Sequence, residues 1–420
     1  MLESDLDDES DTPGRQAPPA AGPGGRGLGR TFWWLWSGNL ISALAMFVVP
    51  FLAMYLASRG LRPSRVGLVM SCYSLGALVC APWVGALSDA IGRRRMLLAT
   101  LLGSAFSAAA LAFLRDPLAV AAAVLCFGAS TAGSRAPMRA IVSDVVERGA
   151  LPRAFGWLYW AENVGASLSM AVGGLVAAGG WTLPFLIDAG STLGYATVVL
   201  LRVPETAPSA TAEPERAPDA EGYRIVLRDG ALLALLGLIL LVDLVYTQVW
   251  VSLPVDMELR GFSARDYGLV GAVSAGLVVA LQPFSARALS HLSPARTLAL
   301  GGLLIALGVG GYALCSSLAG FTFTTAVWTL GEIAFFSTAG ATVSSLAPPQ
   351  ARGRYMGAYS LCFSIGGLAA PAVGPAVLEA LGPRVLWPAC LGLGACAAAG
   401  LLRWGRGRPA GVLGDGRAAA

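Results

Sequence analysis

Long stretches without a charged residue dominate this sequence, and they restrict the chain to very few kinds of fold. Residues 66–88 and 96–114 carry no charge, and only the stretch DAIGRRR separates them. A helix of about 20 residues crosses a hydrocarbon core about 30 Å thick, so each stretch can span a membrane. Charged residues make up 13% of the chain, compared with about 25% in soluble domains. The sequence therefore predicts an integral membrane protein with many spans.

Twelve apolar stretches are long enough to be transmembrane helices. They cover residues 32–57, 66–88, 96–114, 118–142, 154–177, 182–202, 230–253, 266–288, 296–317, 320–346, 355–380 and 384–403. All should be helices, because lipid supplies no water to satisfy backbone groups and no alternating ten-residue pattern indicates a barrel. The predicted fold class is an all-α integral membrane protein, located in the cell membrane.

The distribution of arginine predicts the orientation of the chain. All 29 basic residues are Arg, and a cytoplasmic N-terminus puts 20 of them in tails and cytoplasmic loops, 7 outside and 2 within a helix. Cytoplasmic loops of membrane proteins carry an excess of Lys and Arg, so both termini are predicted to be cytoplasmic. The net charge of +4 then reflects topology, and we expect no nucleic-acid partner.

Polar segments divide the chain into two groups of six predicted helices. Residues 1–30 carry six acids before position 12, lack the basic start of a signal peptide, and should form a disordered cytoplasmic tail. Residues 203–229, rich in Pro, Ala and Glu, should form a cytoplasmic linker between six-helix bundles at 31–202 and 230–403. Residues 404–420 are expected to form a second cytoplasmic tail.

An internal repeat relates the two groups of helices. Matches at a constant offset of 201 residues include Gly67/Gly268, Pro82/Pro283, Arg95/Arg296, Arg153/Arg354, Gly165/Gly366 and Gly173/Gly374. Glycine is so frequent in this chain that glycine matches alone are weak evidence for a repeat. Paired Pro and Arg at the same offset in two separate regions are stronger evidence. Two six-helix repeats with a central site between them are a transporter architecture.

The charged loop after the second predicted helix contains an acid that its own helix does not stabilise. Asp89 lies at the C-terminal end of that helix, whose dipole disfavours negative charge. It needs a partner elsewhere, and Arg93 can pair with an acid on a neighbouring helix end, for which Asp144 and Glu147 are candidates. Gly92 suits the left-handed turn that reverses the chain, and Gly85 lets another helix approach.

The pattern G-x-L-x-D-x-x-G-R-R-R in this loop resembles the signature loop of the major facilitator superfamily. The matching residues are Gly85, Leu87, Asp89, Gly92, Arg93 and Arg94. The resemblance implies a conformational latch in which Asp89 faces the start of helix eleven, around 355–357, and we assign Asp144 to the same latch as a candidate ionic partner of the loop. The corresponding loop of the second half has Ser290 in place of the Asp, so the latch is expected on one side only.

Two segments are similar to helices five and eleven of the drug:proton antiporter branch of that superfamily. They are RAFGWLYWAENVGASLSMAVGG at 153–174 and RYMGAYSLCFSIGGLAAPAVGP at 354–375. Gly165, Gly173 and Gly174 fit the branch's G-x-x-x-G-P-x-x-G-G pattern and should permit close helix packing. Ser169 and Met170 stand where the branch has Gly and Pro. The resemblance implies export in exchange for protons.

Few ionisable residues lie at membrane depth, and each needs a reason because its insertion costs at least about 2.5–3.5 kcal/mol. Asp243 and Glu332 fall near the midpoints of the seventh and tenth predicted helices, without an obvious intramembrane cation. They are the better candidates for protonation. Glu162 on the fifth helix lies at nearly the depth of Arg135 on the fourth, so we expect a buried pair, either static or active in ion coupling.

Aromatic residues accompany the two central acids. Tyr246 and Trp250 follow Asp243 by three and seven residues. Trp328 precedes Glu332 by four residues, so in each case the aromatic residue shares a helix face with the acid. Tyr246, Trp250 and Trp328 are therefore candidates for the walls of a substrate path, with plain helix packing as the alternative for Tyr246 and Trp328.

Missing residue types exclude several chemistries. The chain has no Lys, which rules out a P-loop and a Lys Schiff base. Its one His, His291, lies in a predicted loop, so His-based metal sites and a Ser-His-Asp triad are excluded as well. We expect no enzyme activity, no cofactor and no metal.

These observations favour a monomeric secondary transporter that exports small amphipathic molecules in exchange for protons by alternating access. Uptake of a metabolite by symport or uniport is the alternative within the same class. A non-transporting receptor or scaffold on the same fold is the alternative from another class. The expected partners are a small-molecule substrate, protons and the lipid bilayer.

Overall fold

The computed structural model describes residues 28–206, 220–348 and 351–406, and every regular element in them is a helix. The first half contains α1 (Gly29–Leu44), α2 (Val48–Ser58), α3 (Pro63–Ile91), α4 (Arg93–Phe113), α5 (Pro117–Gly133), α6 (Arg135–Val145), α7 (Leu151–Ala177) and α8 (Thr182–Arg202). The short α9 (Ala220–Arg228) precedes the second half, which contains α10 (Gly230–Tyr246), α11 (Gln248–Leu259), α12 (Ala264–Leu289), α13 (Pro294–Gly311), α14 (Leu318–Leu346), α15 (Arg352–Leu381) and α16 (Pro383–Arg406). The predicted all-α class is confirmed for these residues. We call the side with the start of α1 and the end of α16 the terminal face, and the other side the opposite face.

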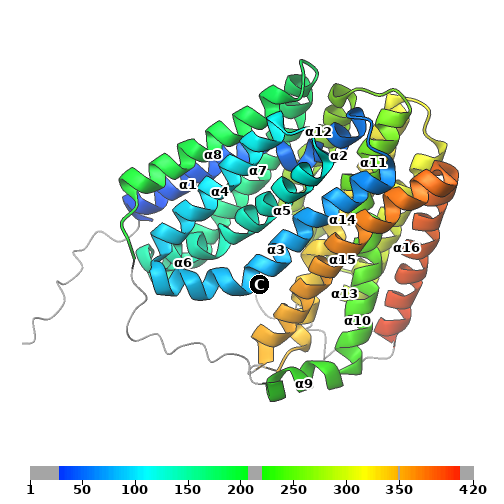
Figure 1. Ribbon diagram of the computed structural model, residues 1–420. Coiled ribbons are helices and arrows are strands. Elements are labelled where there is room, and N and C mark those ends of the chain that lie inside the picture. The colour runs from blue at the N-terminus through cyan, green and yellow to red at the C-terminus, as the bar shows by residue number, and fades with distance from the viewer. Residues whose placement is uncertain (1–27, 207–219, 349–350, 407–420) are drawn as a thin grey trace, which may run out of the picture.

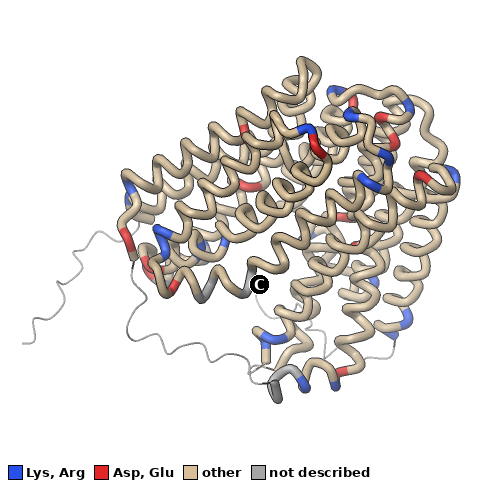
Figure 2. The backbone as a smooth tube through the Cα atoms, viewed as in Figure 1, with Lys and Arg blue, Asp and Glu red and all other residues tan. Residues whose placement is uncertain are grey.

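Eleven helical segments of the described chain are long and apolar enough to cross a membrane, with α1–α2, α5–α6 and α10–α11 each counted as one. Charged residues gather near the helix ends, and the long middle stretches are nearly free of them (Figure 2). The exception is α7, which has 27 residues but is not among the eleven. Polar residues such as Glu162 and Asn163 lower its mean hydropathy. By hydropathy and length alone, the described residues support eleven of the twelve predicted spans.

Three of the predicted spans are interrupted rather than continuous. Residues 45–47 separate α1 from α2, Ser134 separates α5 from α6, and Thr247 separates α10 from α11. The N–H groups of Ser134 and Thr247 keep hydrogen bonds to the residues four positions earlier, whereas the break at 45–47 releases backbone N–H groups that need new partners inside a membrane. At the first break, the Val48 N–H donates a hydrogen bond to the carboxylate of Asp188 on α8 (3.0 Å). Asp188 is therefore buried as a capping group for α2.

Helix starts recur at the offset of the sequence repeat. Pairs of helices begin at Gly29 and Gly230, Pro63 and Ala264, Arg93 and Pro294, Pro117 and Leu318, Leu151 and Arg352, and Thr182 and Pro383, each pair 201 residues apart. The broken first span recurs as well, since α10–α11 is interrupted like α1–α2. The repeat detected in the sequence is thus also a repeat of helical elements.

The two halves touch near the opposite face and spread apart toward the terminal face (Figure 1). Where α3 meets α15, a Cβ on Gly67 would overlap the carbonyl oxygen of Pro371. Where α12 meets α7, a Cβ on Gly268 would lie 2.8 Å from the carbonyl oxygen of Met170. Gly67 and Gly268 are 201 positions apart, and so are Met170 and Pro371. The repeat therefore forms the same contact between the halves twice.

The end of the predicted linker is helical instead of irregular. After the last Pro of the segment, Pro218, the chain forms α9, which contacts α10 and α15 at the terminal face (Figure 1). Val226 is buried at 3% exposure, which gives α9 an anchoring side chain that a disordered linker lacks. Residues 207–219, and most of the predicted tails, lie outside the described part of the chain.

Candidate functional site

A central cavity of about 360 Å³ lies between the two halves. The first half contributes the break after α1, the start of α2 and the middle of α7, and the second half contributes α11, α12 and α14. Most of its lining is apolar or small, with Trp250 and Glu332 as the aromatic and the ionisable side chains. A cavity with these walls suits a ligand that is mainly apolar and carries a few polar groups.

Only one of the two carboxylate oxygens of Glu332 has a hydrogen-bond partner among the described residues. The hydroxyl of Tyr246 donates a hydrogen bond to its Oε1 (2.8 Å). Its Oε2 is buried and has no hydrogen-bond partner among the described residues. Tyr246 is held in turn by edge-to-face contacts with Trp250 and Phe336, whose ring centroids lie 6.3 and 4.9 Å away. One oxygen of the carboxylate is therefore fixed while the other remains without a partner beside the cavity.

Trp328 belongs to the packed interior of the second half and not to the cavity wall. Its side chain is 1% exposed, and its Nε1 donates a hydrogen bond to the hydroxyl of Tyr312 (2.7 Å). The ring also packs against Tyr246, with centroids 5.8 Å apart. Of the two alternatives for this residue, the structure favours helix packing, while Trp250 lines the cavity.

Asp243 is buried between α10 and α15. It is 5% exposed, and a Cβ on Gly366 would overlap its Oδ2. Among the described residues, no hydrogen bond or ion pair reaches its carboxylate. Gly366 is therefore required for this carboxylate to fit, and α15 covers it directly.

A second cavity, of about 340 Å³, lies within the first half and contains both Arg135 and Glu162. The expected buried pair is not formed in this arrangement. Both side chains are exposed, and no ion pair within 4.0 Å joins them in the described part of the chain. Arg135 is the first residue of α6, and similar depth in the membrane does not by itself bring two side chains together.

The loop between α3 and α4 is tied to its own half. Arg93 forms ion pairs with Asp144 on α6 and, at 3.7 Å, with Asp89. The backbone N–H of Arg94 donates to the carboxylate of Glu205 (2.9 Å), which also lies against the positive-φ residue Gly92. Glu205 thus caps the start of α4, where the helix dipole favours negative charge. The sequence patterns did not indicate this acid, although it lies only three residues after the end of α8.

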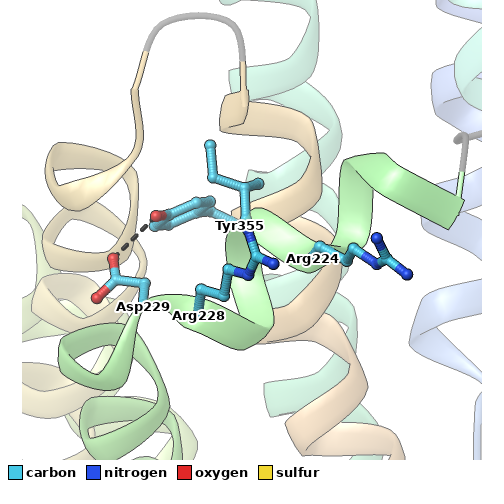
Figure 3. A pocket seen from close by; sticks show the side chains of 5 residues that line it. Arg224, Arg228, Asp229 and Tyr355 are labelled. Atoms are coloured by element: carbon cyan, nitrogen blue, oxygen red, sulfur yellow. Dashed lines mark hydrogen bonds between the residues drawn. The ribbon is translucent and has the colours of Figure 1, made fainter.

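Asp89 and Tyr355 are not brought together in this arrangement. The Asp89 side chain is 61% exposed. The Tyr355 hydroxyl instead donates to Oδ2 of Asp229 (2.8 Å), beside a surface hollow that Arg224 and Arg228 of α9 also line (Figure 3). Asp229 also caps α10 through its other oxygen. The surroundings of Gly85 lie outside the described part of the structure.

The three glycines singled out on α7 all lie at close helix contacts. A Cβ on Gly165 would lie 2.7 Å from the backbone of Ala43 on α1, and one on Gly173 would lie 2.7 Å from the ring of Phe51. A Cβ on Gly174 would lie 2.8 Å from the carbonyl oxygen of Ala264. Small residues at these positions let the helices approach, as is usual in membrane bundles.

One buried ion pair was not anticipated. Asp256 is 1% exposed and accepts hydrogen bonds from Arg260 (2.9 and 2.7 Å) and from Nε1 of Trp387 (2.8 Å). The four-residue spacing of Asp and Arg on one helix was the available signal. In the described residues, no group of three or more His, Cys, Asp or Glu side chains is arranged to hold a metal ion.

Comparison with known proteins places this architecture in a family. The family model described as Major Facilitator Superfamily matches residues 35–371. The chain is 25% identical over 357 residues to the uncharacterized MFS-type transporter YqjV of Bacillus subtilis, covering 83% of this chain and 87% of that protein. It is 26% identical over 352 residues to the multidrug resistance protein MdtH of Aeromonas salmonicida, covering 82% and 86%. The crystal structure of the nucleoside transporter NupG superposes with a TM-score of 0.75 at 13% identity, covering 90% of this chain and all of that one, which shows a shared fold.

The family model covers most of the chain, and the helical architecture agrees with it. Members of this family are membrane transporters of small molecules and not enzymes. The protein is accordingly a multi-pass integral protein of the cell membrane. The chain belongs to the major facilitator superfamily.

Proposed function

We propose that this protein exports small amphipathic molecules in exchange for protons. The observation that carries the proposal is Glu332, which lines a largely apolar cavity between the halves and whose buried Oε2 has no hydrogen-bond partner among the described residues. A carboxylate in that position can take up a proton, and the cavity can take up an apolar molecule. Similarity to proteins named for multidrug and tetracycline resistance supports efflux as the direction.

The proposed topology has twelve spans, with α7 as the twelfth and both termini in the cytoplasm. α7 belongs with the spans because it is 27 residues long, packs against α1 and α12, and is related to the apolar α15 by the repeat. The excess of Arg on the terminal face supports its assignment to the cytoplasm. The working unit is proposed to be a monomer with bundles at 31–202 and 230–403.

Alternating access is proposed to proceed by rocking of the two halves about their contacts near the opposite face. The arrangement described here is then the one open to the cytoplasm, since the halves diverge toward the terminal face (Figure 1). Closing that side would bring the exposed Asp89 toward the start of α15, which is the proposed latch. Tyr355 would then have to exchange its bond with Asp229 for a contact with the α3–α4 loop.

Proton coupling is proposed to use Glu332 and Asp243. Glu332 faces the cavity, where substrate and proton can compete for it. Asp243 lies against Gly366 of α15, so movement of α15 would change its surroundings. Protonation in one arrangement and release in the other would couple the proton gradient to rocking.

The test is dye flux in proteoliposomes with an imposed pH gradient. Wild-type protein should move an amphipathic dye against its concentration gradient, and Glu332→Gln and Asp243→Asn should abolish this movement while keeping dye binding. Glu147→Gln, at an exposed position on the terminal face, is the matched control and should behave like wild type. Unchanged flux in both acid variants would remove proton exchange at these residues from the mechanism. Flux that follows the dye gradient alone would indicate uniport, and binding without flux would indicate a receptor.

A further inference from the structure

The cavity within the first half holds polar groups that the proposed proton exchange does not use. Besides Arg135 and Glu162, it is lined by Asn39 and Tyr195. The Nδ2 atom of Asn39 and the hydroxyl of Tyr195 are buried and have no hydrogen-bond partner among the described residues. Buried polar atoms are nearly always paired, so two unpaired ones in the same cavity call for a ligand or ordered water.

The position of the Tyr195 hydroxyl is fixed by packing. The side chain is 3% exposed, and its ring lies where a Cβ on Gly38 of α1 would be. The ring therefore cannot turn away to reach bulk water without moving α1. A donor held in this way is preorganised for an acceptor that enters the cavity.

Arg135 and Glu162 face the same space although they do not pair. At the repeat-related positions of the second half, 201 residues later, stand Phe336 and Phe363, whose ring centroids lie 5.8 Å apart. The scaffold thus brings these two positions within reach of each other, and in the first half it places a cation and an anion there. A ligand between them would meet both charges.

We propose that this cavity binds the head of a zwitterionic substrate, one that carries a carboxylate and a protonated amine. The guanidinium of Arg135 offers a planar set of N–H donors that matches a carboxylate. Asn39 and Tyr195 add further donors in the same cavity, and Glu162 accepts from the amine. One positive and one negative side chain complement a ligand with one charge of each sign.

The cavity for the charged head adjoins the central cavity. Met46, Asn163 and Ala166 line both spaces. The apolar part of the same molecule can therefore occupy the central cavity beside Trp250. This inference rests on the proposed function, because it names the chemical class of the exported molecule as an amphipathic zwitterion.

The proposed zwitterion site can be tested by equilibrium binding of three probes that share the same apolar group and differ in charge. Full-length protein in lipid nanodiscs is titrated by calorimetry with biphenylalanine, which is a zwitterion, its methyl ester, which is a cation, and its N-acetyl derivative, which is an anion. The zwitterion should bind about tenfold more tightly than either derivative, because each derivative loses one charge-assisted hydrogen bond. Equal affinity for the three probes would overturn the proposal.

Substitutions should separate the two charges. Arg135→Gln should weaken binding of the zwitterion and the anion about tenfold and leave the ester unchanged, whereas Glu162→Gln should weaken the zwitterion and the ester and leave the anion unchanged. Tyr195→Phe should weaken the zwitterion several-fold. Arg115→Gln, at an exposed position between α4 and α5 and outside this cavity, is the matched control and should leave all three affinities unchanged.

The results distinguish this inference from the proposed export. Zwitterion binding that survives in both Arg135→Gln and Glu162→Gln would refute the site, with thermal unfolding used to confirm that the variants are folded. Discrimination among the probes without gradient-driven flux would leave the site in place and refute proton-coupled export. Gradient-driven flux of the dye with no discrimination among the probes would refute the site and leave proton-coupled export in place.

Discussion

Gly268→Ala should shift the balance between the two arrangements of the halves. A Cβ at this position of α12 would lie 2.8 Å from both the Met170 carbonyl oxygen and the Gly174 Cα on α7. Both are backbone atoms, so no side-chain rotation can relieve the overlap, and α7 and α12 must move apart. The contact lies near the opposite face, and the substitution should therefore favour the arrangement in which that face is open.

The size of the shift follows from the cost of overpacking. Inserting a methyl group into a close-packed contact costs about 1–3 kcal/mol, and here the cost applies only while the halves touch. At about 1.4 kcal/mol per tenfold change, the ratio of the two arrangements should shift by about 5- to 150-fold. Replacing Gly by Ala also favours the helix itself by about 0.5–1 kcal/mol, but this gain is the same in both arrangements and cancels.

Distances between spin labels can measure the shift. One pair joins the α2–α3 loop to the α11–α12 loop on the opposite face, and a second joins the α3–α4 loop to the α14–α15 loop on the terminal face. Gly268→Ala should lengthen the first distance and shorten the second. The control is Gly276→Ala on the same helix, where a Cβ meets nothing within 4 Å, and its distributions should match wild type. Unchanged distances in Gly268→Ala would refute the claim that this contact closes the opposite face.

Three further substitutions test other contacts. Asp256→Asn should lower thermal stability by up to about 3 kcal/mol, because it leaves the partly buried Arg260 without its ionic partner, and an unchanged unfolding temperature would contradict this role. Glu205→Gln should cost about 1 kcal/mol by weakening the cap of α4, while Glu147→Gln at an exposed site should cost little in the same unfolding assay. Asp89→Asn should shift the terminal-face distance between spin labels toward the open arrangement, and no shift would exclude the latch.

The spans and the repeat could be predicted because they depend on local composition. Apolar stretches of membrane length must become helices whatever their neighbours are, so the predicted ranges fall on observed helices. The offset of 201 residues is visible at Gly67 and Gly268 in the amino-acid sequence, and in the fold these glycines make close backbone contacts between the halves. Sequence could find them because close backbone approach leaves only glycine possible.

The breaks and the polar contacts could not be predicted, because they depend on residues distant in the chain. The start of α2 is capped by Asp188, which lies 140 positions away. The expected pairing of Arg135 with Glu162 rested on their similar depth in the membrane, but both side chains are exposed and no ion pair joins them among the described residues. Helical spacing placed Trp328 on the face of Glu332, but only packing against Tyr312 shows that its ring turns away from the cavity.

The repeat that relates the helices does not extend to four ionisable groups within the spans. Where the second half has Asp243 and Glu332, the first half has Ser42 and Thr131 at the positions 201 residues earlier. Where the first half has Arg135 and Glu162, the second has two phenylalanines.

Symmetric contacts allow the halves to rock in either direction, but they cannot by themselves distinguish the substrate from the proton. We infer that the division of charge makes that distinction, with the first half holding the charged head of the substrate and the second half holding the exchangeable proton. If so, transferring the acid of the second half to the first, by combining Glu332→Thr with Thr131→Glu, should abolish coupled export, although it leaves the total charge and the helix contacts between the halves unchanged.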